Sequence, residues 1–330
     1  MTMRKPILIL SVDGGGVRGV IPVNVLALIE SQRGIDVRDS FDFFAGVSTG
    51  ALVACYCARG FGSMETLAKD IYGAENMSRI FDKTVWDRLL GRMQSKPKYD
   101  GLNKRAYFRQ MGEDTRINDI ADKHLLVLAY DFINRELVTF KNRRGHDASY
   151  NPTLEEICDA ATAAPTLFPT VPTSGLNRRW LIDGALATND PSICAITEAL
   201  TMGHSIADVF VVSLGTGRPV PDLSQQQQDR IGEASQDWGI YGWVKNGLME
   251  HMLSGSSAVS AHQCQALLGN RYLRIDGTLP RSLMRLDETS PQYVSNLQGY
   301  ATRWFEDYAD PPLQLLRRFQ EQREIASRAQ

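Results

Sequence analysis

The feature that most constrains this chain is a serine between two glycines at residues 46–50, Gly-Val-Ser-Thr-Gly. An apolar segment at 41–45 precedes it and predicts a strand, and the small apolar residues 51–58 predict a helix over 49–59. A serine at such a tight strand-to-helix turn has the arrangement of a nucleophile elbow. A Cβ at either glycine would collide with the neighbouring strand or helix. The predicted turn would hold the Ser48 hydroxyl outside the sheet, and the pattern therefore indicates a serine acyl hydrolase.

The five-residue pattern is short, and ordinary frequencies of glycine and serine produce it by chance in about one chain in ten of this length. It also fits a glycine-rich turn in which Ser48 only caps the following helix. The strand before it and the helix after it favour the nucleophile.

A second glycine-rich loop, residues 13–19 with the sequence Asp-Gly-Gly-Gly-Val-Arg-Gly, follows an apolar strand at 7–12 and precedes a helix at 20–32. The glycines leave the amides of Gly14, Gly15 and Gly16 unscreened at a helix N-terminus, where an anion is stabilised. The oxyanion of an acyl-transfer transition state is such an anion. These amides are therefore candidates for an oxyanion hole.

The same loop allows a different interpretation, because Gly14, Gly16 and Gly19 fit the dinucleotide fingerprint G-x-G-x-x-G. That fingerprint requires a second strand ending in an acidic residue, and the strand around Asp36 is short. The next clear strand leads into Ser48 instead. A nucleotide-binding module without catalysis remains as an alternative of lower rank.

A third motif supplies a carboxylate, since the apolar strand 179–182 ends at Asp183 and Gly184 follows. A serine hydroxyl becomes a nucleophile when a base takes its proton, and Asp183 is a candidate for that base. An ordinary Asp-Gly turn explains the same residues without chemistry. A Ser-His-Asp esterase acting on soluble esters is the rival enzyme, and it requires His204, His251 or His262 as the base.

In order and spacing, residues 13–19, 46–50 and 183–185 resemble the patatin-like phospholipases, and residues 161–169 and 213–217 agree with that family. The similarity extends from residue 7 to about 217. It implies a Ser48–Asp183 dyad, an oxyanion hole at Gly14, Gly15 and Gly16, and no metal or other cofactor. It also implies release of fatty acids from phospholipid at a membrane surface.

Two positions depart from the family pattern: Ala185 replaces a glycine, and Asp190 stands where asparagine is usual. Both could alter how tightly the turn after Asp183 is held. Arg18 has two interpretations, since a guanidinium beside a glycine loop can meet a lipid phosphate or hold the loop through backbone carbonyls.

The alternation of strands and helices predicts a three-layer α/β/α patatin-like fold with a mostly parallel central sheet. Segments 125–130 and 136–140 predict an antiparallel pair, and 271–275 a late strand. We expect residues 6–217 to form the phospholipase core and residues 218–330 a mainly helical part of the same globular unit.

Composition is that of an ordinary globular protein, with 43% hydrophobic residues and a net charge of −2, so DNA and RNA are not expected partners. A strand beginning by Ile7 leaves no room for a signal peptide. Five cysteines without metal-like spacing suggest reduced thiols. The expected location is cytoplasmic, peripheral to the inner face of the membrane when active.

Two segments are candidates for contact with lipid. Apolar residues with basic flanks between 81 and 98 suit an interfacial helix, although core packing is favoured. Residues 238–253 are rich in aromatic, apolar and glycine residues. They fit either a mobile lid over an acyl-chain pocket or a buried helical hairpin.

The chain is also similar to bacterial patatin-like effectors that cyclic nucleotides activate in anti-phage defence. A cyclic di- or trinucleotide activator and a homo-oligomer are therefore open alternatives. The basic pairs 143–144 and 178–179 could receive phosphates, but solvated surface is the simpler explanation.

Overall fold

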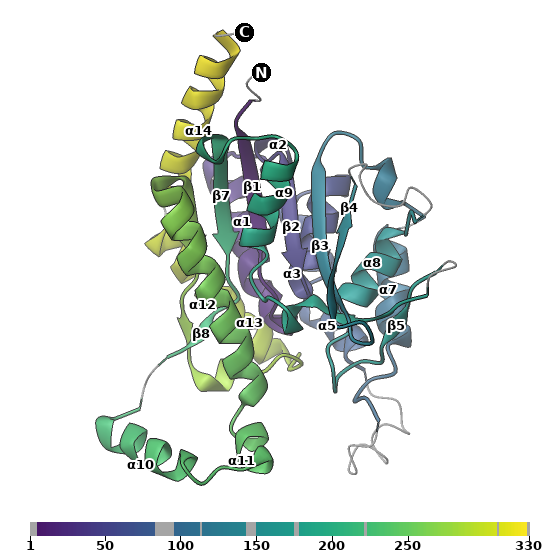
Figure 1. Ribbon diagram of the computed structural model, residues 1–330, viewed down its shortest axis with the longest axis vertical. Helices are drawn as coiled ribbons and strands as arrows, with labels where there is room; N and C mark the ends of the chain where they lie inside the picture. Colours follow the sequence, from purple (N-terminus) through teal and green to yellow (C-terminus); the bar gives the residue numbers. More distant parts are fainter. Residues whose placement is uncertain are drawn as a thin grey trace.

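The computed structural model describes residues 5–82, 96–112, 114–142, 150–174, 178–220, 223–308 and 310–328. Its centre is an eight-stranded sheet with the order β5-β6-β3-β2-β1-β7-β9, in which β4 also pairs with β3 (Figure 1). The strands are β1 Ile7–Val12, β2 Phe43–Val47, β3 His124–Asp131, β4 Glu136–Lys141, β5 Val171–Pro172, β6 Trp180–Asp183, β7 Val209–Leu214 and β9 Tyr272–Ile275. Two short strands, β8 Arg218–Pro219 and β10 Thr278–Leu279, pair separately.

Neighbouring strands from β9 through β7, β1 and β2 to β3 are parallel. The antiparallel exceptions are β4 and β6 on β3, and β5 on β6. The predicted antiparallel pair is thus confirmed as β3 and β4. Strands β1, β2 and β7 are buried throughout, which explains their near-continuous apolar sequences.

Helices cover both faces of the sheet, and the side chains of β1 alternate between them. Leu8 and Leu10 belong to a core formed with α1, α3 and α8, whereas Ile7 and Ile9 pack with α9 and α12. The predicted three-layer fold is confirmed. The helices are α1 Val20–Arg33, α2 Val37–Ser40, α3 Thr49–Arg59, α4 Met64–Asp70, α5 Ala74–Ile80, α7 Leu102–Gly112, α8 Leu154–Ala161, α9 Ser192–Thr201, α10 Gln225–Ser235, α11 Ile240–Lys245, α12 Leu248–Leu268, α13 Pro291–Asp307 and α14 Pro311–Arg328.

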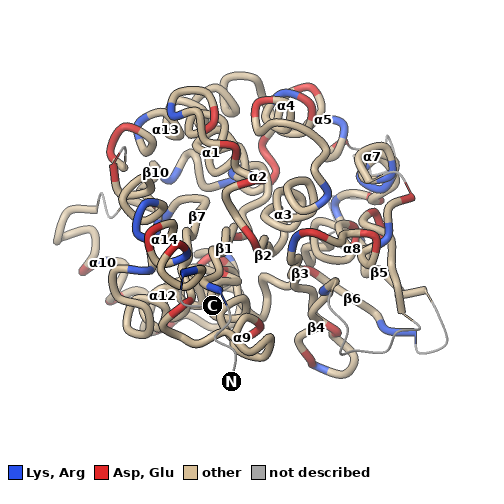
Figure 2. Tube along the Cα trace, turned by 90° about the horizontal axis from the view of Figure 1, so that it is seen from above, with Lys and Arg blue, Asp and Glu red and all other residues tan. Residues whose placement is uncertain are grey.

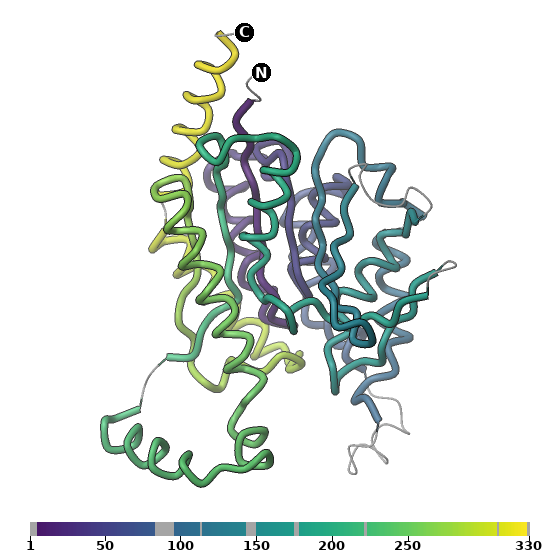
Figure 3. The backbone as a smooth tube through the Cα atoms, in the orientation of Figure 1, coloured from purple at the N-terminus to yellow at the C-terminus, as the bar shows by residue number. Residues whose placement is uncertain are grey.

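Residues after 217 extend the same sheet, because β9 pairs with β7. They also add to its helical layers, since α13 packs against α1. The boundary at 217 stays a prediction. Helices α10 and α11 project from the body of the molecule at the end opposite to the last turns of α14 (Figure 3). Lysine, arginine, aspartate and glutamate residues are interspersed around the outer helices (Figure 2).

The structure describes little of the first segment considered for lipid contact and all of the second. Most of the first, residues 83–95, lies outside the described residues, and Phe81 packs edge-on against Tyr99 with 5.5 Å between ring centroids. The second is not a buried hairpin, because Ile240 is 85% exposed. Across the described ranges, the helices are all too short or too polar to cross a bilayer.

Candidate active site

Ser48 occupies a strained turn between β2 and α3. Its φ and ψ angles are 54° and −126°, a left-handed backbone conformation that is rare for a residue with a side chain. A Cβ on Gly46 would lie 2.1 Å from the carbonyl oxygen of Gly50, and one on Gly50 would lie 2.1 Å from that of Val12. Both glycines are therefore needed for the close approach of strand, turn and helix.

The register of β3 brings Asp183 beside Ser48. Strand β2 pairs with β3 up to Val47 opposite Leu128, and β6 takes the next position with Asp183 opposite Ala129. Strand β4 pairs with the same part of β3, so it occupies the other edge. Hence β2 and β6 lie end to end along one edge of β3, and Asp183 follows directly where Ser48 leaves the sheet.

The Asp183 carboxyl is buried, with 3% of the residue exposed. Its Oδ1 accepts a hydrogen bond of 2.9 Å from the Ala185 amide, and its own amide donates to the Ala163 carbonyl at 3.1 Å. Burial raises the pKa of Asp183 to about 6, while the Ser48 hydroxyl, the Ala185 amide and the Lys104 ammonium each act to lower it. A carboxylate with this pKa is a competent base near neutral pH.

The three glycines of the predicted oxyanion hole are not equivalent. Gly15 and Gly16 line the cavity that contains Ser48 and Asp183. The Gly14 amide instead donates to the Asn189 carbonyl at 3.1 Å, and the Gly14 carbonyl accepts from Thr216 Oγ1 at 2.6 Å. Gly14 therefore anchors the loop, and the geometry favours Gly15 and Gly16 as the oxyanion donors.

Arg18 connects the glycine loop to the backbone of residues 216–217. The side chain is buried, and Nη1 donates to the Gly217 carbonyl at 2.8 Å and to the Thr216 carbonyl at 3.4 Å. Burial lowers the pKa of Arg18. The residue is not among those that line the cavity. Of its two interpretations, the geometry favours support of the loop over contact with a lipid phosphate.

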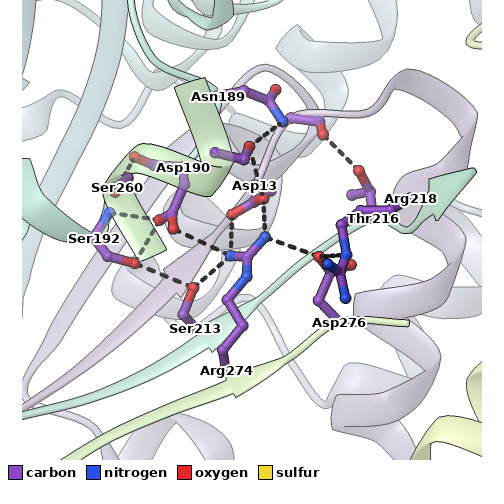
Figure 4. A network of polar contacts seen from close by, with 12 residues as sticks. Asp13, Asn189, Asp190, Ser192, Ser213, Thr216, Arg218, Ser260, Arg274 and Asp276 are labelled. Carbon is purple, nitrogen blue, oxygen red and sulfur yellow. Dashed lines mark hydrogen bonds and ion pairs between the residues drawn. The ribbon is translucent and has the colours of Figure 1, made fainter. Parts of the chain in front are cut away.

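Sequence inspection missed Arg274, the centre of a buried ion network (Figure 4). Its guanidinium bonds to Asp13 at 2.6 and 2.9 Å, to Asp190 at 3.2 Å, to Asp276 at 3.2 Å and to Ser213 at 2.7 Å. Burial alone would lower the pKa of Arg274, but these carboxylates raise it well above the ordinary value. The signal in the sequence was an arginine flanked by Leu273 and Ile275 within the predicted strand 271–275.

This network explains the departure at position 190. The Asp190 carboxylate is fully buried, and it accepts hydrogen bonds from the Ser192 amide at 2.9 Å and the Ser192 hydroxyl at 2.5 Å. Arg274 supplies the opposing charge that a buried aspartate requires. Ser257 joins Asn189 to the same network, because its hydroxyl lies 3.4 Å from Asp13 Oδ2 and 3.1 Å from Asn189 Nδ2.

Lys104 is a second functional candidate that was missed. It lines the cavity with 2% exposure, and its ammonium lies 3.0 Å from the Asp159 carboxylate and 3.2 Å from Thr162 Oγ1. Arg105 pairs with the same Asp159 at 2.7 Å. Lys104 and Arg105 thus share the single carboxylate of Asp159. The positive charge of Lys104 also lowers the pKa of Asp183, which favours the ionised form of that carboxyl.

The cavity has a volume of about 730 Å³, in the range of small-molecule sites. None of the histidines in the described ranges lines it, and His204 lies on the surface with Nδ1 3.0 Å from the Lys5 carbonyl. The arrangement does not supply a Ser-His-Asp triad from these histidines. The apolar part of the lining includes Leu52, Met77, Ile80, Phe81, Phe108, Leu167, Phe168, Leu186, Val244, Leu248, Met249, Met252, Leu253, Met284 and Leu286.

The basic pair 178–179 is engaged with neighbouring side chains. Arg178 lies over the Trp180 ring at 4.9 Å, and Arg179 is 4.0 Å from Asp131 and 3.9 Å from Glu136. The pair 143–144 lies outside the described residues.

Comparisons with known proteins identify the family of the chain. The family model described as patatin-like phospholipase matches residues 10–193. The chain is 30% identical to Patatin-like protein 2 of Oryza sativa subsp. indica, covering 89% of this chain and 82% of that protein. It is 27% identical to Patatin-T5 of Solanum tuberosum, covering 88% and 81%.

A solved structure of human GIVD cytosolic phospholipase A2 in complex with methyl gamma-linolenyl fluorophosphonate shares the fold, with a TM-score of 0.51 and 11% identity. The match covers 97% of this chain and 60% of that one. The chain belongs to the patatin-like phospholipase family of lipid acyl hydrolases.

Proposed function

We propose that Ser48 and Asp183 form the catalytic dyad with which this enzyme releases fatty acids from phospholipids. The observation that carries the proposal is the end-to-end placement of β2 and β6, which puts a buried carboxylate beside a strained serine. Gly15 and Gly16 line the same cavity.

In the first half-reaction, Asp183 accepts the proton of the Ser48 hydroxyl as Oγ attacks the ester carbonyl carbon. Negative charge develops on the carbonyl oxygen, where the Gly15 and Gly16 amides stabilise it. The tetrahedral intermediate then expels the lysolipid alkoxide, which takes the proton from Asp183. An acyl ester on Ser48 remains.

In the second half-reaction, Asp183 accepts a proton from water as the water oxygen attacks the acyl carbonyl. Collapse of the intermediate releases the fatty acid, and the Ser48 oxygen regains its proton from Asp183. The cycle balances without any group other than the two side chains, the backbone donors and water.

Covalent labelling tests the proposal. A long-chain alkyl fluorophosphonate should form an adduct whose phosphorus is bonded to Ser48 Oγ, located by mass spectrometry of the digested protein. The Ser48→Ala variant should take up no label. An adduct on another residue, with Ser48 unmodified, would refute Ser48 as the nucleophile.

Lys104 gives the proposal a pH signature. Because Asp183 must be ionised, kcat/KM should fall as pH drops through about 6. Lys104→Met should move this acid limb to higher pH, since the ammonium favours the ionised carboxylate, and Lys104→Arg should restore it in part. Asp159 keeps Arg105 as a partner, so the variant should fold.

Lys141→Met is the matched control, because Lys141 also forms a largely buried ion pair, with Glu198 at 2.8 Å, but does not line the cavity. It should leave the acid limb in place. An unchanged limb in Lys104→Met would show that Lys104 has only a structural role.

A cyclic-nucleotide activator and a role in anti-phage defence are not part of this proposal. Patatin-like protein 2 and Patatin-T5, the two sequence relatives named above, are plant proteins. The basic pair Arg178 and Arg179 already contacts Trp180 and Glu136.

A further inference from the structure

Helix α11 and the first turns of α12 expose large apolar side chains. In α11, Ile240 is 85% exposed and Tyr241 is 80% exposed, values expected for lysine or glutamate rather than for residues of these types. Their exposed neighbours are Trp243, Val244, Leu248, Met249 and Met252. An exposed patch of this kind marks an interaction surface.

The exposed patch is continuous with the active-site cavity. Val244, Leu248, Met249 and Met252 are exposed residues that also line the cavity containing Ser48. Helix α11 projects beyond the end of the sheet toward which β1 runs, and α12 leads from it back along the sheet (Figure 1). An apolar path therefore joins the tip of α11 to the nucleophile.

We propose that α11, with the first turns of α12, docks on the surface of a phospholipid bilayer and guides an acyl chain into the cavity. The inference rests on the proposed function, since it names where the substrate of that site enters. A bilayer is the occupant that the chemistry favours, because the phospholipid to be cleaved is itself in the surface and its acyl chains match the lining.

The composition of the patch indicates how it binds. Helix α11 has a single charged residue, Lys245, so attraction to anionic lipid contributes little. Trp238 and Trp243 contact each other edge to face, with 5.4 Å between ring centroids, and Tyr241 lies beside them in sequence. Tryptophan and tyrosine favour the interface between lipid and water. Docking should therefore occur on zwitterionic lipid and persist at high salt.

Sedimentation with phosphatidylcholine vesicles tests the docking. The full chain carrying Ser48→Ala is used, so that hydrolysis does not alter the vesicles. It should bind, and adding Ile240→Ser and Tyr241→Ser should lower the partition coefficient at least about tenfold, because each large apolar side chain that leaves water contributes about that factor. Neither residue lines the cavity.

Ile325→Ser is the matched control, since Ile325 is 67% exposed but lies in α14 at the opposite end of the molecule (Figure 3). It should bind vesicles like its parent. With Ser48 present, the Ile240/Tyr241 variant should lose vesicle hydrolysis relative to hydrolysis of a soluble short-chain ester, and the ratio of the two rates reports docking alone.

Equal vesicle binding by the parent and the Ile240/Tyr241 variant would overturn the docking surface. So would binding that requires anionic lipid and disappears at high salt. A parent that ignores vesicles but forms a dimer, which the same substitutions dissociate, would assign the patch to a second copy of the chain. Absence of soluble-ester hydrolysis in the unmodified enzyme would instead refute the proposed chemistry, because sedimentation does not depend on it.

Discussion

Asp183→Asn should reduce kcat/KM for ester hydrolysis by at least about 10⁴-fold, while the protein becomes more stable. Asparagine keeps an oxygen for the Ala185 amide but cannot accept the Ser48 proton. In the native enzyme, burial raises the pKa of Asp183 to about 6 from an ordinary value of 3.8. Keeping this carboxylate ionised in the fold therefore costs free energy that the neutral amide avoids.

The sign of the pH dependence follows from the raised pKa. Between about pH 4 and pH 6 the folded state holds a proton on Asp183 that the unfolded state has lost, so this group lowers stability as pH rises through that window. Above it, the cost reaches up to about 3 kcal/mol, at roughly 1.4 kcal/mol for each unit of pKa. Asp183→Asn should gain most in the free energy of unfolding near pH 8, and little near pH 4.

Urea unfolding at both pH values, together with kcat/KM on a soluble ester, measures the two effects. Ser48→Ala is the companion variant, because it should lose activity to a similar degree without the pH-dependent gain. Substantial activity in Asp183→Asn, or a stability gain that is equal at both pH values, would contradict the assignment of Asp183 as a buried catalytic base.

Arg274→Met should lower the free energy of unfolding by about 3–5 kcal/mol, the largest effect on stability that we expect from a single substitution. Methionine fills similar space but leaves the buried carboxylates of Asp13 and Asp190 without their cation. Since a domain of this kind has a total stability of only about 5–15 kcal/mol, the variant should be near the limit of folding. Thermal unfolding with circular dichroism detects the change.

Arg218→Met is the control for this prediction. Arg218 also contacts Asp276 at 3.2 Å, but its side chain is 62% exposed, so its loss should cost at most about 1 kcal/mol. Adding Asp190→Asn to Arg274→Met should recover part of the stability, because one uncompensated charge is removed. Equal effects of the two arginine substitutions would show that burial of the network contributes nothing.

Much of the site was predictable from local sequence. The Gly-x-Ser-x-Gly turn is encoded by Gly46 and Gly50, whose Cβ atoms would clash with the start of α3 and with the end of β1. Strands β1 and β7 were evident because a strand buried on both faces is apolar at nearly every position. Such features depend on near neighbours, and sequence patterns record them well.

Features that depend on long-range register could not be derived in the same way. The contact of Asp183 with Ser48 arises because β2 and β6 share one edge of β3. The family resemblance implied the Ser48–Asp183 dyad, but the spacing of the two residues in the sequence could not show it. The engagement of the Gly14 amide by Asn189 joins segments about 175 residues apart. The burial of Lys104 and Arg274 was not predicted, because Asp159 and Asp13, the carboxylates that pair with them, come from distant segments.

The most direct test of the Ser–Asp dyad is the activity of a variant in which all five histidines are replaced by glutamine. If Asp183 is the base, kcat/KM for a soluble ester should remain within about tenfold of the unmodified enzyme, and its acid limb should stay near pH 6. A fall to the level of Ser48→Ala, in a variant that circular dichroism shows to be folded, would mean that a histidine takes the serine proton and would contradict the dyad.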